Sequence, residues 1–237
     1  MSFPIRDRGY PHPELLADTD WLANHLSDPT LRIVDAREDD DYASGHIPGA
    51  VHVGGFLLGG LRDGAEMPKP AAFAELIGAL GIDESTPVVV YDAGRSQMAG
   101  MTAWAFLYYG HPDIRYLEGG LTQWTAEGRS VTRELPSHEP RTFAAQPAEG
   151  VLCRLDQAKA SVDDDGAVFW DTRSLGEFDG NTAGWNPPPQ LGHLPGAIHL
   201  EWTELFNGDG GTLLPAAELT TLLGAKGITP ELVVHTY

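Results

Sequence analysis

One group of ionisable residues occurs twice in this sequence in the same order, and the spacing from the His to the Tyr is nearly the same in both copies. The two copies are Asp35, Arg37, His46 and Tyr91, and Asp171, Arg173, His193 and Tyr237. In each copy the Asp and Arg form an Asp-x-Arg pair, the His belongs to a Gly-His-x-Pro-Gly-Ala segment, and the Tyr ends an apolar run. A carboxylate and a guanidinium so placed can make charge-assisted hydrogen bonds that tie a strand to the turn following it. A repeat this long indicates a duplicated domain.

Alternating strands and helices must position these residues. In the first copy we expect helices over residues 14–29, 70–80, 101–109 and 121–126, a short helix from residue 40, and strands over residues 31–34, 51–53, 88–91 and 114–117. In the second copy we expect helices over residues 155–160 and 215–223, and strands over residues 168–170, 198–200 and 232–235. Strands that alternate with helices favour an α/β fold, with a parallel sheet and helices on both faces.

This plan divides the chain into a first domain over residues 10–128, a linker over 129–150 and a second domain over 151–237. The linker is predicted from its prolines among polar residues. The second copy also has extra residues between its Asp-x-Arg pair and its Gly-His turn. These lie around 180–190 and include a run of prolines, which favours an exposed surface loop. The alternative is that this loop shapes the rim of a crevice.

Composition argues against several classes of partner. The formal net charge is −19, from 34 acidic against 15 basic residues, and it would repel a phosphate backbone, so no nucleic acid is expected. No apolar run approaches the roughly 18 to 20 residues that span a bilayer, and the polar N-terminus does not predict a signal peptide, so no membrane partner is expected. The single cysteine rules out an intramolecular disulfide and favours a reducing, cytoplasmic location. The acidity either serves solubility or reflects a salty habitat.

The Asp-x-Arg pair, the Gly-His-x-Pro-Gly-Ala segment and the apolar strand ending in Tyr together resemble the rhodanese homology domain. The pair of copies, from about Leu16 to Tyr237, resembles the tandem-domain sulfurtransferases of the thiosulfate and mercaptopyruvate types. The resemblance implies two rhodanese-like α/β domains, the second incomplete in this sequence. It also implies that a cysteine in the loop after the central strand accepts sulfur as a persulfide and passes it to cyanide or a thiol. The implied partners are a small sulfur donor and a thiophilic acceptor, with no cofactor.

In the first copy the residue after Tyr91 is Asp92, at the position where the resemblance implies a nucleophile. Tandem sulfurtransferases typically carry Asp at this position of a catalytically silent first domain, so we expect the first copy to be silent. The alternative is that Asp92 is itself a nucleophile, as in some phosphoryl-transfer enzymes. Arg95 follows in the same loop, and it either faces the crevice between the domains or pairs with Asp92.

In the second copy the sulfur-accepting cysteine is expected directly after Tyr237, so no residue of the sequence itself is predicted to be the nucleophile. Backbone amides and a helix N-terminus would stabilise a thiolate there. Three explanations stay open: a truncated polypeptide, a separate chain or continuation that supplies the rest of the second domain, and a modified residue at that position. Related thiosulfate enzymes often place a basic residue four positions after the Arg of this pair. This sequence has Glu177 there, which puts anion binding at that position in doubt.

The remaining candidates are expected to be structural. Cys153 lies at a domain start, without the glycines that wrap amides around a sulfur, which predicts a partly buried structural thiol. His46 and His193 are expected to stabilise turns rather than act as bases, because the silent copy keeps its histidine too. Gly119 and Gly120 are expected to form the turn before the last helix of the first copy. No spacing of His or Cys predicts a metal site.

The sequence therefore predicts transfer of a sulfane sulfur from thiosulfate, with mercaptopyruvate as the alternative donor, at a site in the second domain where it meets the first. The residues expected beside the substrate or organising the loop are Asp171, Arg173, His193, Tyr237 and Arg95. The rival from another class is a non-catalytic binding or sensor protein built from two silent domains. A phosphatase with the same loop architecture would also need the missing cysteine, and the tandem arrangement argues against it.

Overall fold

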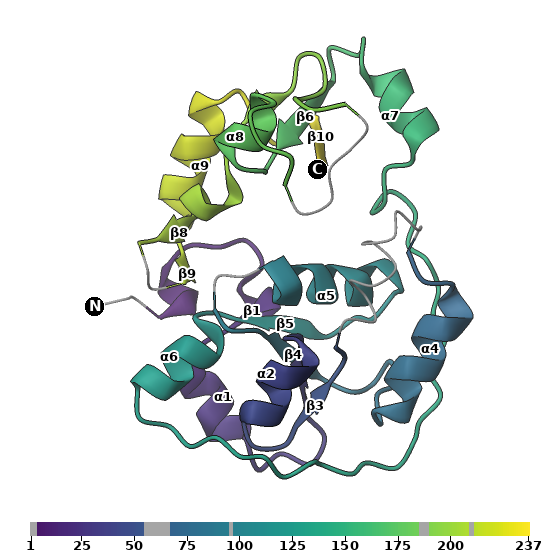
Figure 1. The fold of residues 1–237 in the computed structure, drawn as a ribbon, viewed down its shortest axis with the longest axis vertical. Helices are drawn as coiled ribbons and strands as arrows, with labels where there is room; N and C mark the ends of the chain where they lie inside the picture. Colours follow the sequence, from purple (N-terminus) through teal and green to yellow (C-terminus); the bar gives the residue numbers. More distant parts are fainter. Residues whose placement is uncertain (1–3, 55–66, 95–96, 185–189, 209–210) are drawn as a thin grey trace. The chain divides into compact units, whose positions relative to one another are not determined.

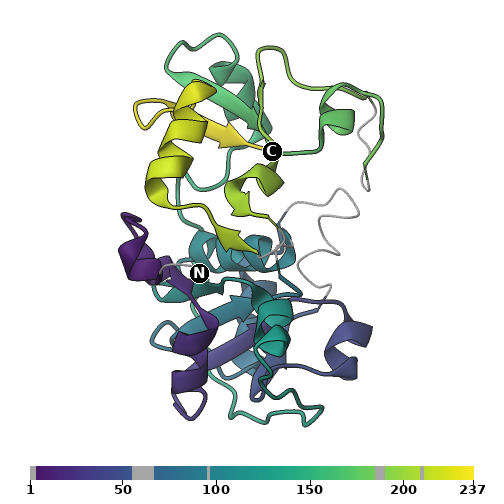
Figure 2. The same ribbon diagram turned by 90° about the vertical axis from the view of Figure 1, so that its left-hand side faces the viewer.

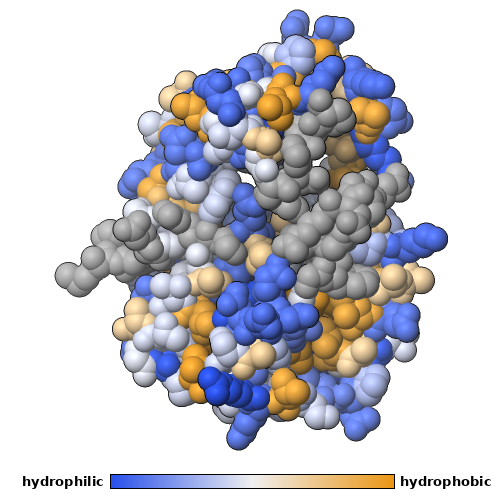
Figure 3. All heavy atoms as spheres, viewed as in Figure 1, coloured by the Kyte–Doolittle hydropathy of each residue, from blue (hydrophilic) through white to orange (hydrophobic). Residues whose placement is uncertain are grey.

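The chain forms two compact units. The computed structural model describes residues 4–54, 67–94, 97–184, 190–208 and 211–237. The first unit comprises Met1–Glu149 with Gly208–Thr212, and the second comprises Gly150–Asn207 with Leu213–Tyr237. Among the described residues, no helix combines the length and the apolar character needed to span a bilayer. Hydrophilic side chains cover much of the face seen in Figure 3, as expected for so acidic a chain.

A parallel sheet forms the centre of the first unit. Its strands are β1 (Leu16–Ala17), β2 (Arg32–Asp35), β3 (Ala50–His52), β4 (Val88–Tyr91) and β5 (Ile114–Leu117), in the order β1-β5-β4-β2-β3. The central strand β4 is an uninterrupted apolar run, and all four of its residues are buried. A strand with this pattern must be covered on both faces, as parallel strands usually are. The α/β class with a parallel sheet is confirmed.

Helices cover both faces of this sheet (Figure 1, Figure 2). They are α1 (Thr19–His25), α2 (Asp39–Ser44), α4 (Pro70–Ala79), α5 (Gln97–Tyr108) and α6 (Gly120–Ala126). Leu22 of α1 and Trp124 of α6 join Val89 in one buried cluster on one face. On the other face, Phe73 of α4 meets Phe106 of α5 edge to face, with ring centroids 5.5 Å apart. Both clusters exclude water from β4, which fixes this strand and the start of the loop that follows it.

The first predicted helix, over residues 14–29, was wrong at both ends, because α1 spans only Thr19–His25. Residues Pro13–Leu15 form a 3-10 helix, and Leu16–Ala17 form the edge strand β1, which pairs with β5. The helix α1 begins only at Thr19, because the Asp18 side chain caps it by accepting a hydrogen bond from the Trp21 amide at 2.7 Å. Leu16 of β1 lies at a helical spacing from the apolar residues of α1, but the backbone groups of β1 pair with the distant strand β5.

The segment over residues 129–149, expected to be a linker, lies along the first unit and belongs to it. His46 and Thr132 exchange two backbone hydrogen bonds of 2.9 Å, and the Arg141 amide donates to the Gly78 carbonyl at 2.8 Å. Phe143 is buried against the rings of α4. Hydrogen bonding of this extent makes the segment part of the packed unit rather than a flexible connection.

The second unit repeats the centre of this plan. Its elements are α7 (Leu155–Ser161), β6 (Ala167–Asp171), α8 (Leu175–Phe178), β7 (Ile198–His199), α9 (Ala216–Ala225) and β10 (Val233–Thr236). Its sheet is parallel, in the order β10-β6-β7, and Thr236 pairs with Trp170 as Val90 pairs with Val34 in the first unit. A two-stranded sheet of β8 (Phe206–Asn207) and β9 (Thr212–Leu213) was not predicted. Part of the predicted surface loop, residues 185–189, lies outside the described residues.

A buried hydrogen-bonded group joins β2, β4 and the Gly-His turn of the first unit. Arg37 Nη2 donates to Asp35 Oδ2 at 2.6 Å and to the Gly45 carbonyl at 2.8 Å, which confirms the predicted tie between strand and turn. The Tyr91 hydroxyl donates to Asp35 Oδ2 at 2.6 Å and accepts from the Ile47 amide at 3.1 Å. Burial and the neighbouring Asp35 carboxylate raise the pKa of Tyr91 well above its ordinary value, so the hydroxyl keeps its proton.

Replacing Tyr91 by Phe should destabilise the protein by about 1–3 kcal/mol, because the Ile47 amide would be left buried without an acceptor and Asp35 would lose a donor. Tyr108→Phe is the matched control, since Tyr108 is also buried and its hydroxyl makes no hydrogen bond with any described residue. Urea unfolding of both variants measures the difference. Equal unfolding free energies for the two variants would contradict the role given to the Tyr91 hydroxyl.

Two helical glycines should respond to Ala in opposite directions. A Cβ atom at Gly78 in α4 would collide with the backbone carbonyl oxygen of Arg141, so Gly78→Ala should cost about 1–3 kcal/mol. A Cβ atom at Gly100 in α5 would meet no described atom within 4 Å, so Gly100→Ala should stabilise the protein by about 0.5–1 kcal/mol. Thermal unfolding tests both. A neutral Gly78→Ala variant would show that the segment over residues 129–149 packs more loosely than described.

Candidate functional site

The loop after β4 holds the carboxylate of Asp92 among backbone amides. Asp92 is 1 % exposed and directly follows Tyr91. Its Oδ1 accepts from the Gly94 amide at 2.8 Å, and its Oδ2 accepts from the Ala99 amide at 2.8 Å, in the first turn of α5. Free amides at the N-terminus of a helix favour an anion, and α5, with 12 residues, has the aligned peptide dipoles that do so. In this copy a carboxylate of the chain itself occupies an anion cradle.

The turn at Gly119 and Gly120 closes the back of this loop. Gly120 has a φ of +50°, and a Cβ atom there would lie 2.5 Å from the Asp92 carbonyl oxygen. A Cβ atom at Gly94, where φ is +116°, would lie 2.5 Å from the Gly119 carbonyl oxygen. The Leu121 amide donates to the Asp92 carbonyl at 2.8 Å. These glycines are therefore required by close backbone approach, which confirms their predicted structural role.

Asp92 is poorly placed to act as a nucleophile. Its side chain is buried, and both carboxylate oxygens already accept hydrogen bonds from backbone amides. Amide donors lower the basicity of a carboxylate and so weaken it as an attacking group. Arg95 lies outside the described residues, so its two predicted roles both stay predictions.

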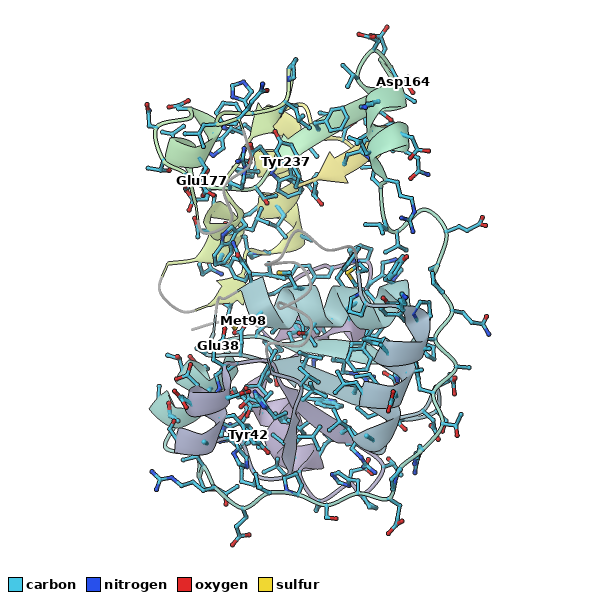
Figure 4. All side chains as sticks on the ribbon, turned by 45° about the vertical axis from the view of Figure 1, so that its right-hand side comes forward. Glu38, Tyr42, Met98, Asp164, Glu177 and Tyr237 are labelled. Atoms are coloured by element: carbon cyan, nitrogen blue, oxygen red, sulfur yellow. The ribbon has the colours of Figure 1, made fainter. Side chains whose placement is uncertain are left out.

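In the second unit, Asp171, Arg173 and Tyr237 adopt the arrangement of their counterparts in the first. Arg173 Nη2 donates to Asp171 Oδ2 at 2.6 Å and to the Gly192 carbonyl at 2.9 Å. The Tyr237 hydroxyl accepts from the Leu194 amide at 3.1 Å, as Tyr91 does from its own turn. Burial would raise the pKa of Asp171, but hydrogen bonds and the positive charge of Arg173 outweigh it and hold the pKa below its ordinary value. Figure 4 shows Tyr237 at the carboxyl end of the strand β10.

Both repeated histidines contact backbone carbonyls beside their turns. His46 is buried, its Nδ1 lies 3.1 Å from the Tyr42 carbonyl, and its ring stacks on Tyr42 with centroids 4.0 Å apart. His193 Nδ1 lies 2.8 Å from the Phe178 carbonyl, and its ring stacks on Phe178 at 3.7 Å. The same contact with carbonyl and ring in both copies supports a turn-stabilising role for these residues rather than a role as a base.

Glu177 has a structural partner of its own. Glu177 Oε2 accepts from the Ser174 hydroxyl at 2.7 Å and from the Ser174 amide at 3.3 Å, while the Glu177 amide donates back to the Ser174 hydroxyl at 3.4 Å. This reciprocal arrangement is a capping box that begins α8. Glu177 therefore has a structural role in starting α8, at the position where related thiosulfate enzymes often carry a basic residue.

Thr172, which no sequence pattern marks as a site residue, holds the backbone at the end of β10. The Tyr237 carbonyl accepts from the Thr172 amide at 3.0 Å and from the Thr172 hydroxyl at 2.9 Å. In the first copy the Tyr91 carbonyl accepts from the Ala36 amide at 2.9 Å, and Ala36 has no hydroxyl to add. The sequence does contain one feature that could have indicated Thr172. The middle residue of the Asp-x-Arg pair is Ala36 in the first copy and Thr172 in the second, and it is the only position of that motif at which the copies differ.

Cys153 was predicted to be partly buried, and this was wrong: its side chain is exposed. The reason is its place just before α7, where the one hydrogen bond of its sulfur to a described residue is to the neighbouring Arg154 carbonyl, at 3.7 Å. Within the part of the chain that the structure describes, no group of His, Cys, Asp and Glu is arranged to hold a metal ion.

Comparison with known proteins agrees with this geometry. The family model described as the rhodanese-like domain matches residues 18–127. The chain is 35% identical to the sulfur carrier protein TtuD of Thermus thermophilus, over 97% of this chain and 84% of that protein. It is 31% identical to the thiosulfate sulfurtransferase of Corynebacterium glutamicum, over 95% and 78%. The crystal structure of SseA from Escherichia coli, titled as a 3-mercaptopyruvate sulfotransferase, matches with a TM-score of 0.78 at 25% identity, over 94% and 87%. The chain belongs to the rhodanese-like sulfurtransferase family.

Proposed function

We propose that this protein transfers a sulfane sulfur from thiosulfate to cyanide or a thiol, through a persulfide on a cysteine directly after Tyr237. One observation carries the proposal: Tyr237 is held by Asp171 and Leu194 as Tyr91 is held by Asp35 and Ile47. The residue after Tyr237 thus corresponds to Asp92, whose side chain lies among loop amides. A thiolate at that position would receive the stabilisation that the Asp92 carboxylate receives.

We infer that the second unit is a second rhodanese-like domain. The paired strands β6 and β10 share the register of β2 and β4, and each pair ends in the same Asp, Arg and Tyr group. A separate chain or a continuation of this one would supply the loop, the nucleophile and the elements that correspond to α5, β5 and α6. The first domain is silent in this scheme because Asp92 fills its cradle.

The chemistry is two displacements at sulfur. The thiolate attacks the outer sulfur of thiosulfate, a cysteine S–S bond forms, and the S–S bond of thiosulfate breaks so that sulfite leaves with the electron pair. Cyanide or a thiolate then attacks the outer sulfur of the persulfide, and the cysteine thiolate leaves. Loop amides would stabilise the negative sulfur in both steps, and the covalent intermediate would give ping-pong kinetics.

Mercaptopyruvate is the alternative donor, and a non-catalytic sensor is the alternative from another class. The relative of Corynebacterium glutamicum is named for thiosulfate, while SseA is named for 3-mercaptopyruvate. Glu177 places a negative charge at the position where related thiosulfate enzymes often have a basic residue, but its capping role in α8 makes it compatible with either donor. A sensor would need a residue other than cysteine after Tyr237.

The full polypeptide should form thiocyanate from cyanide faster with thiosulfate than with mercaptopyruvate. Replacing the cysteine after Tyr237 by Ser should abolish the activity with either donor, because no persulfide can form. Cys153→Ser is the matched control and should keep full activity, since that thiol is exposed and lies outside the loop. Asp92→Asn should also stay active. Inactivity of the reduced full polypeptide with both donors would exclude the sulfurtransferase and favour the sensor.

Thr172→Ala should slow sulfur transfer several-fold without unfolding the protein, because alanine already stands at the corresponding Ala36. In the full polypeptide the Thr172 hydroxyl would polarise the peptide group between Tyr237 and the next residue, and the N–H of that peptide would lie beside the proposed sulfur. Its loss should raise the pH at which iodoacetamide alkylates the cysteine, while Thr172→Ser should restore it. An unchanged alkylation profile in Thr172→Ala, on a protein that is active, would contradict this positioning role.

A further inference from the structure

A second histidine recurs in both copies, six positions after the histidine of the Gly-His turn. It is His52 in the first copy and His199 in the second, so the repeated segment reads Gly-His-x-Pro-Gly-Ala-x-His. Each of the two ends a strand, β3 or β7, and pairs in register with the Asp of the Asp-x-Arg pair on the neighbouring strand. The chemistry proposed above does not use this histidine, although both copies carry it.

The imidazole of this histidine donates a hydrogen bond to the backbone carbonyl of the Arg in the Asp-x-Arg pair. His199 Nε2 lies 2.9 Å from the Arg173 carbonyl oxygen. In the first copy His52 Nε2 lies 2.7 Å from the Arg37 carbonyl oxygen. A carbonyl oxygen can only accept, so Nε2 carries the proton in both rings. The Arg of each pair is therefore held at its backbone as well as through its guanidinium.

Aromatic contacts fix the direction in which this imidazole points. The ring of His199 lies against Phe178 with centroids 4.8 Å apart, and Phe178 also stacks on His193 at 3.7 Å. In the first copy Tyr42 stacks on both corresponding histidines, at 4.0 and 4.5 Å. A side chain packed on its face has already lost rotamer freedom, so little further entropy is lost when its edge binds the carbonyl.

Three successive carbonyls at the end of β6 accept hydrogen bonds from residues at or just after the end of β7. The Asp171 carbonyl accepts from the Leu200 amide at 3.2 Å, and the Thr172 carbonyl accepts from the Trp202 amide at 3.0 Å. The third carbonyl is the one that His199 binds. The first two donors are backbone amides, which remain after substitution, while the third is a side chain that a substitution can remove.

The backbone held in this way carries the groups that bind the end of β10. Thr172 donates its amide and its hydroxyl to the Tyr237 carbonyl, at 3.0 and 2.9 Å. Arg173 donates to Asp171 at 2.6 Å, and its guanidinium carbon lies 5.3 Å from the centroid of the Tyr237 ring. A shift of the Arg173 backbone would therefore move the donors that determine where Tyr237, and the residue after it, lie.

We propose that His199 is a positioning residue for sulfur transfer: by holding the Arg173 carbonyl, it keeps the donors of Thr172 and Arg173 on the end of β10. This inference rests on the proposed function, since it assumes a reactive cysteine directly after Tyr237. His52 makes the same contact in the first domain, which takes no part in the proposed chemistry.

Two substitutions in the full polypeptide separate the hydrogen bond of His199 from its ring contact. His199→Phe keeps an aromatic ring against Phe178 and loses the donor, while His199→Gln loses the ring and keeps an N–H donor at a similar reach. We expect His199→Phe to slow sulfur transfer from thiosulfate to cyanide several-fold. It should also raise the pH at which iodoacetamide alkylates the cysteine after Tyr237, because less well placed amides stabilise a thiolate less. His199→Gln should restore both, whereas a role in ring packing alone would give the reverse order.

His52→Phe is the matched control, because it removes the same hydrogen bond from the first copy. Thermal unfolding should show a similar loss of stability in His52→Phe and His199→Phe, while the transfer rate of His52→Phe should equal that of the unaltered protein. His199→Asn, whose amide is too short to reach the carbonyl, replaces His199→Phe in these comparisons if the latter does not fold.

A readout that needs no activity comes from Arg173, whose Nε donates to Asp171 Oδ1 at 3.0 Å. Exchange of this Nε–H with water, followed by NMR, should be several-fold faster in His199→Phe and unchanged in His199→Gln. Absence of transfer in the unaltered polypeptide would refute the proposed function, whereas unchanged Arg173 exchange in His199→Phe would refute the positioning role. That role is also overturned if His199→Gln is as slow as His199→Phe, or if His52→Phe slows transfer equally.

Discussion

A buried carboxylate is the constraint on which both units depend. Asp35 and Asp171 are fully buried, and a charged group in such a place is tolerated only when it is paired and hydrogen-bonded. The Arg two residues later supplies the charge, and it also reaches the carbonyl of the Gly-His turn. In the first unit the Tyr at the end of the neighbouring strand supplies a further donor. One carboxylate thus joins two strands and a turn. The residue that follows the Tyr is therefore held at a fixed place at the end of its strand.

The hydrogen-bonded Asp, Arg and Tyr group with its Gly-His turn, called the frame below, fixes where the residue after the Tyr lies but not which side chain that residue carries. In the first unit the residue at that place is Asp92, whose carboxylate accepts hydrogen bonds from the Gly94 and Ala99 amides of the loop. The frame remains intact because its stability comes from the buried pair and the covered strand β4, neither of which requires the loop to react. The two copies also differ at the middle of the Asp-x-Arg pair, where Thr172 adds a hydroxyl to the strand-end carbonyl that Ala36 cannot reach. The same frame can therefore carry different side chains at the residue after the Tyr and at the middle of the Asp-x-Arg pair.

Much of the fold could be predicted because its signals are local. The run Val88–Tyr91 and the segment Ile114–Leu117 are strands with the predicted bounds. The first is apolar throughout, as a buried parallel strand usually is. Leu16–Ala17 was assigned to a helix, because its pairing with β5 is made by a residue range about a hundred positions away and leaves no local trace. The same holds for the predicted linker over residues 129–150: the backbone partners of its residues 129–149, such as Gly78, are distant in the sequence. The repeated site residues could be predicted because each recurs in both copies. Thr172 could not, because it acts on a backbone carbonyl that no sequence pattern marks.

The strong acidity of the chain and the binding of anions are compatible because they act over different ranges. At physiological salt, exposed charges separated by more than about 8 Å are largely screened, so the net charge of −19 mainly slows the approach of an anion. Binding itself depends on donors in direct contact, such as the amides of Gly94 and Ala99 around a carboxylate. Amides carry no net charge and are fixed by the loop and by α5, so they favour an anion whatever the sign of the surrounding surface. A chain with few basic residues can therefore bind anions, provided that backbone geometry supplies the donors.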